Sequence, residues 1–556
     1  MEVLVIIVLV LLAIAGATTL GPKLGVAAPL VLVVVGIAVS FLPFVPALEI
    51  EPEWILAGVL PPLLYSASVS MPTMEFRREF GAIGGLSVLL VIVSAVVLGL
   101  FFAWVIPGLG LAWGIALGAI VSPTDAVATS IVKRSGVSPR VVAILEGESL
   151  LNDASALVLL RTAIAAAAAS FSLGGFIGSF AYSVAVALVF GWVVGRLNLI
   201  VRARVTDATI NTVLSFTVPF LASIPAEALG ASGLVAAVVA GLVTGRRGPR
   251  VLSPQHRLSD AQNWRTIEVI LEGLVFLVMG LELFGIVQDV QADHAGFLPA
   301  LGVALGALVL TIVVRAAYVA PLLGILAWRS RRGEQMRPRM ESMQQRLVDP
   351  GAASAALERR GGPGARRTPT AADLGRFATR VRRAIADIDY FKSAPLGWRE
   401  GTVVVWAGMR GAVTVAAAQT LPAPQTPGRS LLVLIAFIVA AASLLIQGGT
   451  LGWVVRRVKP APVDTALERD ERARLMTLLF DAAQSVPIPA STERTPEAFM
   501  ALREARLKRI RAQRAALLDA RDDGAFSADL LDGALTNLDA DQISLDLKGA
   551  PLTPSD

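Results

Sequence analysis

Three carboxylates lie inside long apolar stretches of this 556-residue chain: Asp125, Glu148 and Asp153. An ionisable side chain within hydrocarbon is costly and marks a functional site by default. Asp125 ends the run Ser122–Asp125, in which a proline removes a helix hydrogen bond and disfavours α geometry at the residue before it. The run therefore predicts a broken helix that frees backbone carbonyls beside a carboxylate, as transporters do around ions. A plain proline kink, with Asp125 capping the following half-helix, is the alternative interpretation.

Polar residues recur in the next apolar stretch, at Glu148, Ser149, Asn152 and Asp153. On a helix, residues four apart lie on the same face, so Glu148 lies over Asn152 and Ser149 lies over Asp153. This spacing gives two adjacent polar stripes. At 1.5 Å per residue, Asp153 lies about 18 Å from the start of its stretch and Asp125 about 21 Å from the opposite side. In a hydrocarbon core roughly 30 Å thick, the two carboxylates can share one depth. Two structural polar patches matched in depth by chance are the alternative.

Two arginines also lie within apolar stretches, Arg315 and Arg410. A lone buried cation is costly, so each is expected to pair with a carboxylate. The three acids and these two arginines together leave one net negative charge, which is what a site for one monovalent cation or one proton requires. Arg161 is nearer the end of its stretch and is expected to extend its head group into water. Glu272 and Glu282 fit transport or helix packing equally well.

The composition indicates whether the chain lies in water or in a membrane. Hydrophobic residues make up 55% and charged residues 17%, and the mean hydropathy is +0.67, whereas ordinary soluble domains carry roughly 25% charged residues. The absence of cysteine excludes disulfides, thiolate catalysis and zinc–thiolate sites, and only two histidines are present. No HExxH motif occurs and no nucleophile–base pair is recognisable. We therefore expect a membrane protein that is not an enzyme and needs no cofactor.

Apolar stretches of about 20 residues are long enough to cross a bilayer as helices. About thirteen are present, near residues 2–20, 24–44, 52–70, 81–105, 111–132, 141–169, 173–195, 207–228, 231–245, 266–288, 298–328, 401–421 and 430–455. Lysine and arginine gather in alternate loops, with Arg429 as the exception. The positive-inside rule then predicts a multi-pass protein of the cell membrane, with the N-terminus outside and the C-terminus in the cytoplasm.

The net positive charge of the chain comes from one segment. Residues 329–400 hold 16 Lys/Arg and 8 Asp/Glu, a surplus larger than the net charge of +6 for the whole chain. No nucleic-acid-binding motif accompanies it, so a basic cytoplasmic loop is expected, flexible over residues 333–375. Helical apolar spacing returns near residues 465–482 and 493–520, in a tail whose partner the sequence does not identify. The expected parts are transmembrane helices in 1–328, a basic linker in 329–399, two transmembrane helices in 400–457 and a helical cytoplasmic tail in 458–556.

Three motifs resemble the sodium/proton exchanger family, in its bacterial electroneutral branch. They are Ser122-Pro123-Thr124-Asp125-Ala126-Val127-Ala128, Glu146-Gly147-Glu148-Ser149-Leu150-Leu151-Asn152-Asp153 and Gly408-Met409-Arg410-Gly411-Ala412-Val413. Residues 227–234 and 271–283 are also similar, and the resemblance covers roughly 1–328 and 399–457. It implies an all-α polytopic fold with inverted repeats and two crossed, broken helices. It also implies a homodimer that exchanges a monovalent cation for protons.

The resemblance assigns roles residue by residue. Asp153 would be the carboxylate shared by cation and proton, and Na⁺ would be held by Asp153, Thr124 and Ser149. The full set that would line the ion site is Asp153, Asp125, Thr124, Ser149 and Asn152. Asn152 stands where electrogenic relatives carry a second aspartate, which implies one-for-one exchange.

The resemblance further implies that Glu148 pairs with Arg315 and that Arg410 neutralises the broken-helix region. Many relatives carry an acid near Ser66, and this chain does not, so ion ligation from that span is an open point.

One buried carboxylate is sufficient for antiport. Sodium prefers oxygen ligands, and burial disfavours the charged form of a carboxylate, so that a proton and a cation compete for Asp153. If the empty, charged site cannot cross, only loaded states move, and exchange needs no ATP. Asp153 as a structural partner of an arginine is the alternative. A cation channel, a K⁺/H⁺ exchanger using the same oxygens and a transporter of organic anions are the competing functions, although no repeated carbonyl-filter segment is visible.

Overall fold

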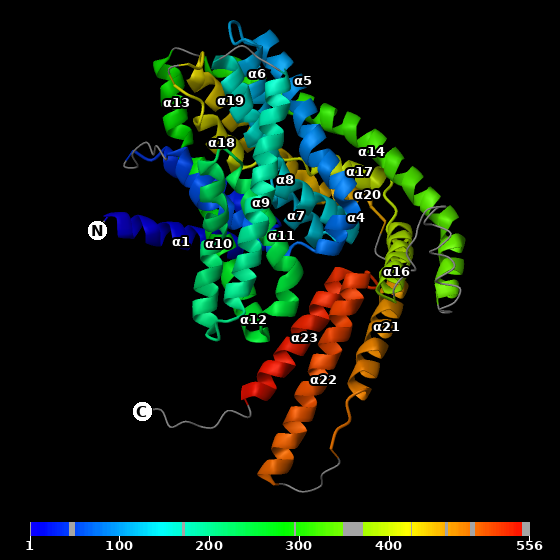
Figure 1. The fold of residues 1–556 in the computed structure, drawn as a ribbon. Helices are drawn as coiled ribbons and strands as arrows, with labels where there is room; N and C mark the ends of the chain where they lie inside the picture. The colour runs from blue at the N-terminus through cyan, green and yellow to red at the C-terminus, as the bar shows by residue number, and fades with distance from the viewer. Residues whose placement is uncertain are drawn as a thin grey trace. The chain divides into compact units, whose positions relative to one another are not determined.

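The computed structural model describes residues 2–43, 51–168, 173–293, 296–347, 371–423, 425–461, 465–489 and 495–547, and their regular secondary structure is entirely helical (Figure 1). The chain forms two compact units, Met1–Leu322 with Trp398–Pro462 and Leu323–Gly397 with Val463–Asp556.

The first unit contains the apolar helices. Its helices are α1 (Glu2–Leu20), α2 (Ala28–Ser40), α3 (Leu60–Ser70), α4 (Thr73–Gly84), α5 (Leu90–Val105), α6 (Leu111–Val121), α7 (Val127–Arg134), α8 (Pro139–Ala168), α9 (Leu173–Arg202), α10 (Ala208–Ala228), α11 (Gly233–Val251), α12 (Pro254–Leu281), α13 (Leu283–Ala292), the start of α14 (Phe297–Leu347), α17 (Trp398–Trp406), α18 (Ala412–Gln419), α19 (Arg429–Ser443) and α20 (Gly449–Val458). Short π-helical turns at Trp54–Val59, Gly85–Leu89 and Leu444–Gly448, and a 3-10 turn at Pro22–Leu24, join some of them.

The expected helical membrane fold is confirmed, with different boundaries in several places. Among the described residues, seven helices are long and apolar enough to cross a membrane, and four further apolar helices are shorter. The stretches expected at 111–132 and 401–421 are each interrupted, between α6 and α7 and between α17 and α18. Helix α14 does not stop near residue 328 but continues to Leu347, so the first part of the expected flexible linker is helical. Residues 348–370 of that linker lie outside the described part of the chain.

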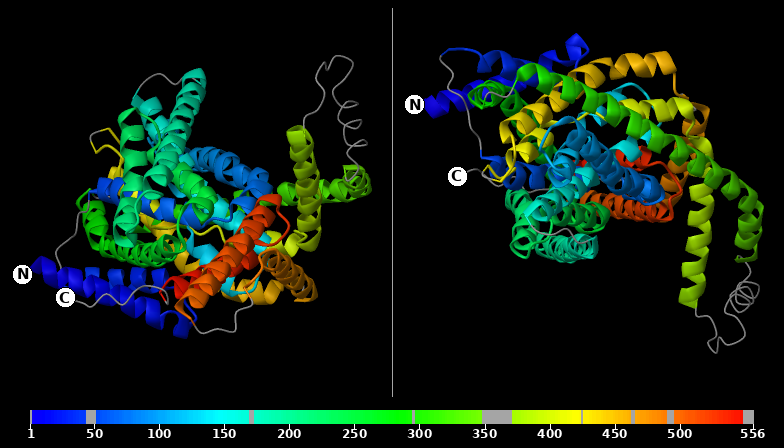
Figure 2. Two further views of the ribbon diagram at one scale, coloured as in Figure 1. Left: turned by 60° about the horizontal axis from the view of Figure 1, so that its bottom comes forward. Right: turned by 90° about the horizontal axis from the view of Figure 1, so that it is seen from above.

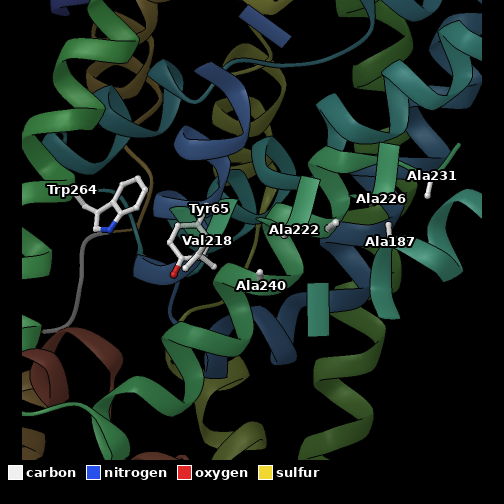
Figure 3. Close-up of a cluster of buried hydrophobic side chains, with 9 residues drawn as sticks. Tyr65, Ala187, Val218, Ala222, Ala226, Ala231, Ala240 and Trp264 are labelled. Atoms are coloured by element: carbon white, nitrogen blue, oxygen red, sulfur yellow. The ribbon is translucent and has the colours of Figure 1, made fainter. Parts of the chain in front are cut away.

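Small residues let several helices of the first unit approach closely. A buried cluster on α3, α9, α10, α11 and α12 is built from Tyr65, Ala187, Val218, Ala222, Ala226, Ala231, Ala236, Ala240 and Trp264 (Figure 3). A Cβ added at Gly241 of α11 would lie 2.6 Å from the carbonyl oxygen of Tyr65 on α3, so only glycine permits this contact. Close packing through small residues is how membrane helices associate without a hydrophobic driving force. The cluster holds α3 and α12, which carry polar residues of the site, in fixed register.

The second unit is built from the end of α14, α16 (Ala371–Ser393), α21 (Thr465–Gln484), α22 (Pro496–Asp523) and α23 (Ala528–Leu547). Helix α22 runs beside α23 in both views of Figure 2. Helices α21, α22 and α23 share a core of leucines and one isoleucine: Leu475, Leu479, Ile510, Leu517, Leu531, Leu535 and Leu538. The two helices expected in the tail are present, and α23 is an additional one that the sequence analysis did not identify. Helix α16, which lies in the later part of the expected linker, is joined to α22 by an ion pair from Arg382 to Asp523 at 3.1 Å.

Candidate ion-binding site

Two interrupted helices cross at the centre of the site. Helix α6 ends at Val121 and α7 begins at Val127, while α17 ends at Trp406 and α18 begins at Ala412. The backbone N–H of Asp125 in the first break donates to the carbonyl oxygen of Met409 in the second, at 2.8 Å. A Cβ at Gly411 would overlap the Asp125 carboxylate. The second break therefore needs glycine at this position for the two chains to meet.

Asp125 holds the first break in place. Its Oδ1 accepts a hydrogen bond from the Val127 N–H at 2.8 Å, which caps the free amide end of α7. The capping role that the sequence offered as an alternative is therefore present. The carboxylate nevertheless lies at the crossing, because its other oxygen faces Gly411. One side chain thus caps a half-helix and contributes negative charge between the two breaks.

Glu148 and Arg315 form a buried bidentate ion pair. Arg315 Nη1 lies 2.5 Å from Glu148 Oε1 and Nη2 lies 2.7 Å from Oε2, with each residue 2% exposed. Thr124 in the first break donates its hydroxyl to Glu148 Oε1 at 3.1 Å, and Arg315 Nε donates to the Val404 carbonyl at 2.9 Å. The carboxylate and guanidinium groups are thus paired and hydrogen-bonded, as a desolvated ion pair must be. The pair ties α8 and α14 to the broken helices.

Asn152 connects α8 directly to the first break. Its Nδ2 donates to the Thr124 carbonyl at 2.9 Å and to the Thr124 hydroxyl at 2.7 Å. Asn152 is 1% exposed, and its Oδ1 is a buried oxygen without a hydrogen-bond partner in the described part of the chain. The amide group is therefore fixed at one end and presents an unused acceptor at the other.

Arg410 differs from the expectation that it pairs with a carboxylate. Its Nε donates to the Val121 carbonyl at 2.9 Å, and its Nη1 donates to the Gly408 carbonyl. Its own N–H donates to Ser443 Oγ at 2.8 Å, and no described carboxylate forms an ion pair with its side chain. The breaks free carbonyls at the C-terminal ends of α6 and α17, where the helix dipole is negative. These carbonyls take the place of the expected carboxylate.

Asp153 lies next to Asn152 on α8, on the neighbouring polar stripe. It is partly exposed, it is close enough to Asp125 for their charges to interact, and within the described ranges no cation pairs with it. The Ser149 hydroxyl one turn earlier donates to the Glu146 carbonyl of the same helix at 3.0 Å and makes no hydrogen bond to Asp153. Of the five acidic and basic groups that the sequence singled out, Asp153 is the carboxylate without a hydrogen bond or an ion pair in the described structure.

The structure adds acids that the sequence left undecided or did not single out. Glu268 on α12 accepts a hydrogen bond from Ser66, the position where an acid was missing. Glu272, one turn later, lies close enough to Asp125 and Glu268 to interact with both charges. The four-residue spacing of these glutamates on one helix face was the available signal. Glu282 instead bonds Gln419, which fits helix packing. Within the described residues no group of three or more His, Cys, Asp or Glu side chains is arranged to hold a metal ion.

Comparison with known proteins identifies the family and the fold. A family model described as sodium/hydrogen exchanger, transmembrane, matches residues 7–360 and 374–457. An Escherichia coli protein named as an uncharacterized Na⁺/H⁺ exchanger, YjcE, is 34% identical over 293 residues, which is 51% of this chain and 53% of that protein. An uncharacterized Na⁺/H⁺ exchanger of Mycobacterium tuberculosis, Rv2287, is 28% identical over 496 residues, covering 87% of this chain and 80% of the relative.

A Bacillus subtilis relative is named as a sodium, potassium, lithium and rubidium/H⁺ antiporter. It is 32% identical over 276 residues, or 48% of this chain and 41% of that protein. Among solved structures, the sodium proton antiporter MjNhaP1 of Methanocaldococcus jannaschii matches 82% of this chain and 99% of its own, with a TM-score of 0.58 and 16% identity. That likeness concerns the fold.

Proposed function

This chain belongs to the sodium/hydrogen exchanger family, a family of membrane cation/proton antiporters, and from that premise we propose that it exchanges sodium for protons at Asp153. The observation that carries the proposal is the charge balance of the site. Glu148 and Arg315 neutralise each other, and the guanidinium of Arg410 donates to carbonyls that the two breaks free. Of the three carboxylates that the sequence singled out, Asp153 is left without a hydrogen bond or an ion pair in the described part of the chain, so its charge is available to a cation or a proton.

Competition at this carboxylate produces antiport. Asp153 is only partly exposed, and this partial burial disfavours the charged form of its carboxylate, so the side chain is stabilised by gaining either a proton or a cation. The proton and the sodium ion use the same oxygens and cannot be held together. The empty, negatively charged site pays a large desolvation penalty when it moves toward the other side of the membrane, whereas the loaded site does not. Only loaded forms therefore cross, and one gradient drives the other.

The oxygens for a sodium ion come from Asp153 and its neighbours. The Thr124 hydroxyl donates to Glu148 and accepts from Asn152, which leaves it one lone pair for a cation. Asn152 Oδ1 is a further free acceptor, and Ser149 keeps its acceptor capacity after donating to its own helix. Asp125 adds negative charge nearby. Such hard oxygen ligands suit sodium, lithium or potassium.

Asn152 is the basis for one-for-one, electroneutral exchange. A neutral amide stands beside Asp153, and both described donations of its nitrogen go to Thr124. One carboxylate then carries either one proton or one monovalent cation. Transport should not respond to an imposed membrane potential when the pH on both sides is clamped.

The test of the function is the Asp153→Asn variant in proteoliposomes. The neutral amide cannot exchange a proton for a cation, so cation-dependent dequenching of a pH-sensitive dye should be lost. Asp541→Asn is the matched control, because Asp541 lies on α23 and is exposed; its activity should equal that of the native chain. Robust sodium-dependent proton flux through Asp153→Asn, at native protein content in the vesicles, would refute the assignment.

The choice among cations is open to direct titration. The name of the Bacillus subtilis relative covers sodium, potassium, lithium and rubidium, so the oxygen-lined site is tested with each of these cations across pH. A K⁺/H⁺ exchanger would show dequenching with potassium and not with sodium. A cation channel would conduct without regard to an imposed pH gradient. We further propose a homodimer with the N-terminus outside, the C-terminus in the cytoplasm and the basic linker on the cytoplasmic side.

A further inference from the structure

A cavity of about 260 Å³ lies in the first unit, away from the crossing of the broken helices. Its polar lining includes Glu53, Arg161, Glu227, Ser232 and Thr420, and aliphatic side chains line the rest. One water molecule occupies about 30 Å³ in the liquid. The cavity is therefore large enough for a monovalent cation with several of its waters.

The polar lining residues share one side of the membrane part. Glu53 precedes the span that begins at the π-helical turn, Glu227 is in the last turn of α10, and Ser232 is the N-cap of α11. Thr420 is the C-cap of α18. By the alternation of basic loops, each of these positions is at the outer end of its span. The cavity therefore belongs to the outer half of the protein.

Helix α8 leads from the ion site to this cavity. Leu157 and Arg161 follow Asp153 by four and eight residues, so all three lie on one helix face. At 1.5 Å per residue they are displaced along the axis by about 6 and 12 Å. Leu157 lines the cavity, together with Leu56 and Leu234. An apolar layer one turn thick thus separates Asp153 from a polar cavity.

Arg161 and Glu227 form an ion pair at the cavity. Arg161 Nη2 lies 3.5 Å from Glu227 Oε1, and the side chains are 60% and 34% exposed. Gly230, with φ of +72°, turns the chain after α10, and a Cβ at Gly233 would lie 2.8 Å from Glu227 Cγ. Gly233 thus leaves the space that the glutamate occupies, and Gly230 supplies the left-handed turn. An exposed ion pair at this distance is weak, so it can open and close without disrupting the fold.

We propose that this cavity is the outer approach by which a hydrated monovalent cation reaches Asp153, and that the Arg161–Glu227 ion pair gates it. Closed, the arginine repels cations at the entrance. Open, Glu227 joins Glu53 and gives the cavity negative charge, which concentrates cations ahead of the leucine layer. The inference rests on the proposed antiport function, because it gives a path to the same carboxylate.

The chain contains no cysteine, so single cysteines can report accessibility without removing native thiols. In the full-length protein, Leu157→Cys and Ile164→Cys place thiols in the cavity lining. Val309→Cys on α14 is the control, because Val309 is 61% exposed on an apolar membrane helix. Membrane-impermeant thiosulfonates of matched size, one cationic and one anionic, are added to the outside of oriented vesicles. The cavity thiols should react, the cationic reagent faster, while Val309→Cys stays unlabelled.

Opening the gate should raise the labelling rate. Adding Glu227→Gln to Leu157→Cys removes an exposed ion pair, for which we expect a rate increase of roughly 1.5- to 5-fold with a neutral reagent. The same change should reduce the preference for the cationic reagent, whereas Arg161→Gln should increase it and Arg161→Lys should restore the native preference. Labelling of both cavity thiols only from the inside, or of neither, or rates independent of residues 161 and 227, would overturn the proposal.

The labelling needs no transport, so the two proposals can fail separately. In an Asp153→Asn background, outside labelling of Leu157→Cys should persist although exchange is lost. Persistent exchange in that background contradicts the proposed function and leaves the cavity assignment standing. Absent labelling with normal exchange in the native background contradicts the cavity assignment alone.

Discussion

The Glu148–Arg315 ion pair gives the sharpest test of the scaffold around Asp153. In Arg315→Met the methionine fills part of the volume but leaves Glu148 without the bonds of 2.5 and 2.7 Å, in a position 2% exposed. The Thr124 hydroxyl is then the remaining described donor to the Glu148 carboxylate. Removing one partner of a buried pair costs about 3–5 kcal/mol, because a charge stays buried and uncompensated. We expect a loss of unfolding free energy of that size.

The assay is denaturant or thermal unfolding of purified protein in one detergent, with a double-mutant cycle. Glu148→Gln in the Arg315→Met background removes the stranded charge and should recover most of the loss, so the two single effects do not add. The control is Arg337→Met near the end of α14. Arg337 forms ion pairs with Glu341 and Asp389, and the exposed fractions of the three side chains are 35%, 49% and 48%. Each of these exposed pairs should contribute about 1 kcal/mol or less.

The reasoning is refuted if Arg315→Met costs no more than Arg337→Met, or if the single effects at residues 148 and 315 are additive. Either result would mean that the charges are solvated and that the balance leaving Asp153 unpaired does not hold.

Three further predictions follow from single contacts. Gly411→Ala should abolish exchange and lower thermal stability, since its Cβ overlaps the Asp125 carboxylate, whereas Gly449→Ala, whose Cβ meets nothing within 4 Å, should behave as native in both assays. Asn152→Asp should make the exchange rate depend on an imposed membrane potential in pH-clamped liposomes, because a second carboxylate adds a charge to the transported site; a flat voltage response would contradict this. In the second unit, partial desolvation raises the pKa of the Asp532 carboxyl although the side chain is exposed. The small stabilisation that its neutral form gives is therefore full below the ordinary aspartate pKa and is lost as pH rises through the pKa of the folded state. Asp532→Asn should therefore slow hydrogen exchange of α23 at pH 7 and flatten its pH dependence after correction for intrinsic rates, and unchanged protection would count against the argument.

The first helix break could be predicted from the sequence because its cause is local. The second break and its contact with the first depend on residues far apart in the chain and could not be predicted in this way. Pro123 acts on its own neighbours, so the break between α6 and α7 follows from the sequence. The second break contains glycines without a proline, and the crossing was expected only from the resemblance. The bond from Asp125 to Met409 joins residues far apart in the chain. Periodicity carries no information on such a pairing.

The partners of buried polar groups were the least predictable feature. The rule that a buried cation needs a negative partner is correct for Arg410, but the partners are carbonyls freed by the two breaks. Ser66 and Glu268 are likewise brought together by packing of α3 and α12. The ion pair of Arg161 with Glu227 was also missed. The position of Arg161 near the end of its apolar stretch indicated only that its head group would reach water.

The end of α14 was predicted wrongly because hydropathy measures how apolar a segment is and not whether it is helical. Hydropathy ends the expected eleventh span near residue 328, because arginines and glutamate follow. Those residues are good helix formers, and α14 continues to Leu347. Apolar length therefore predicted membrane passage but not where a helix stops.

The central claim is that sodium and a proton compete for Asp153, and proton release on sodium binding measures it most directly. Purified protein in a weakly buffered detergent solution is mixed with sodium chloride, and a pH dye records the protons released against a choline chloride control. The account predicts one proton per bound sodium in the native chain and in Asp541→Asn, and none in Asp153→Asn. Sodium binding without proton release, or equal release from Asp153→Asn, would contradict it.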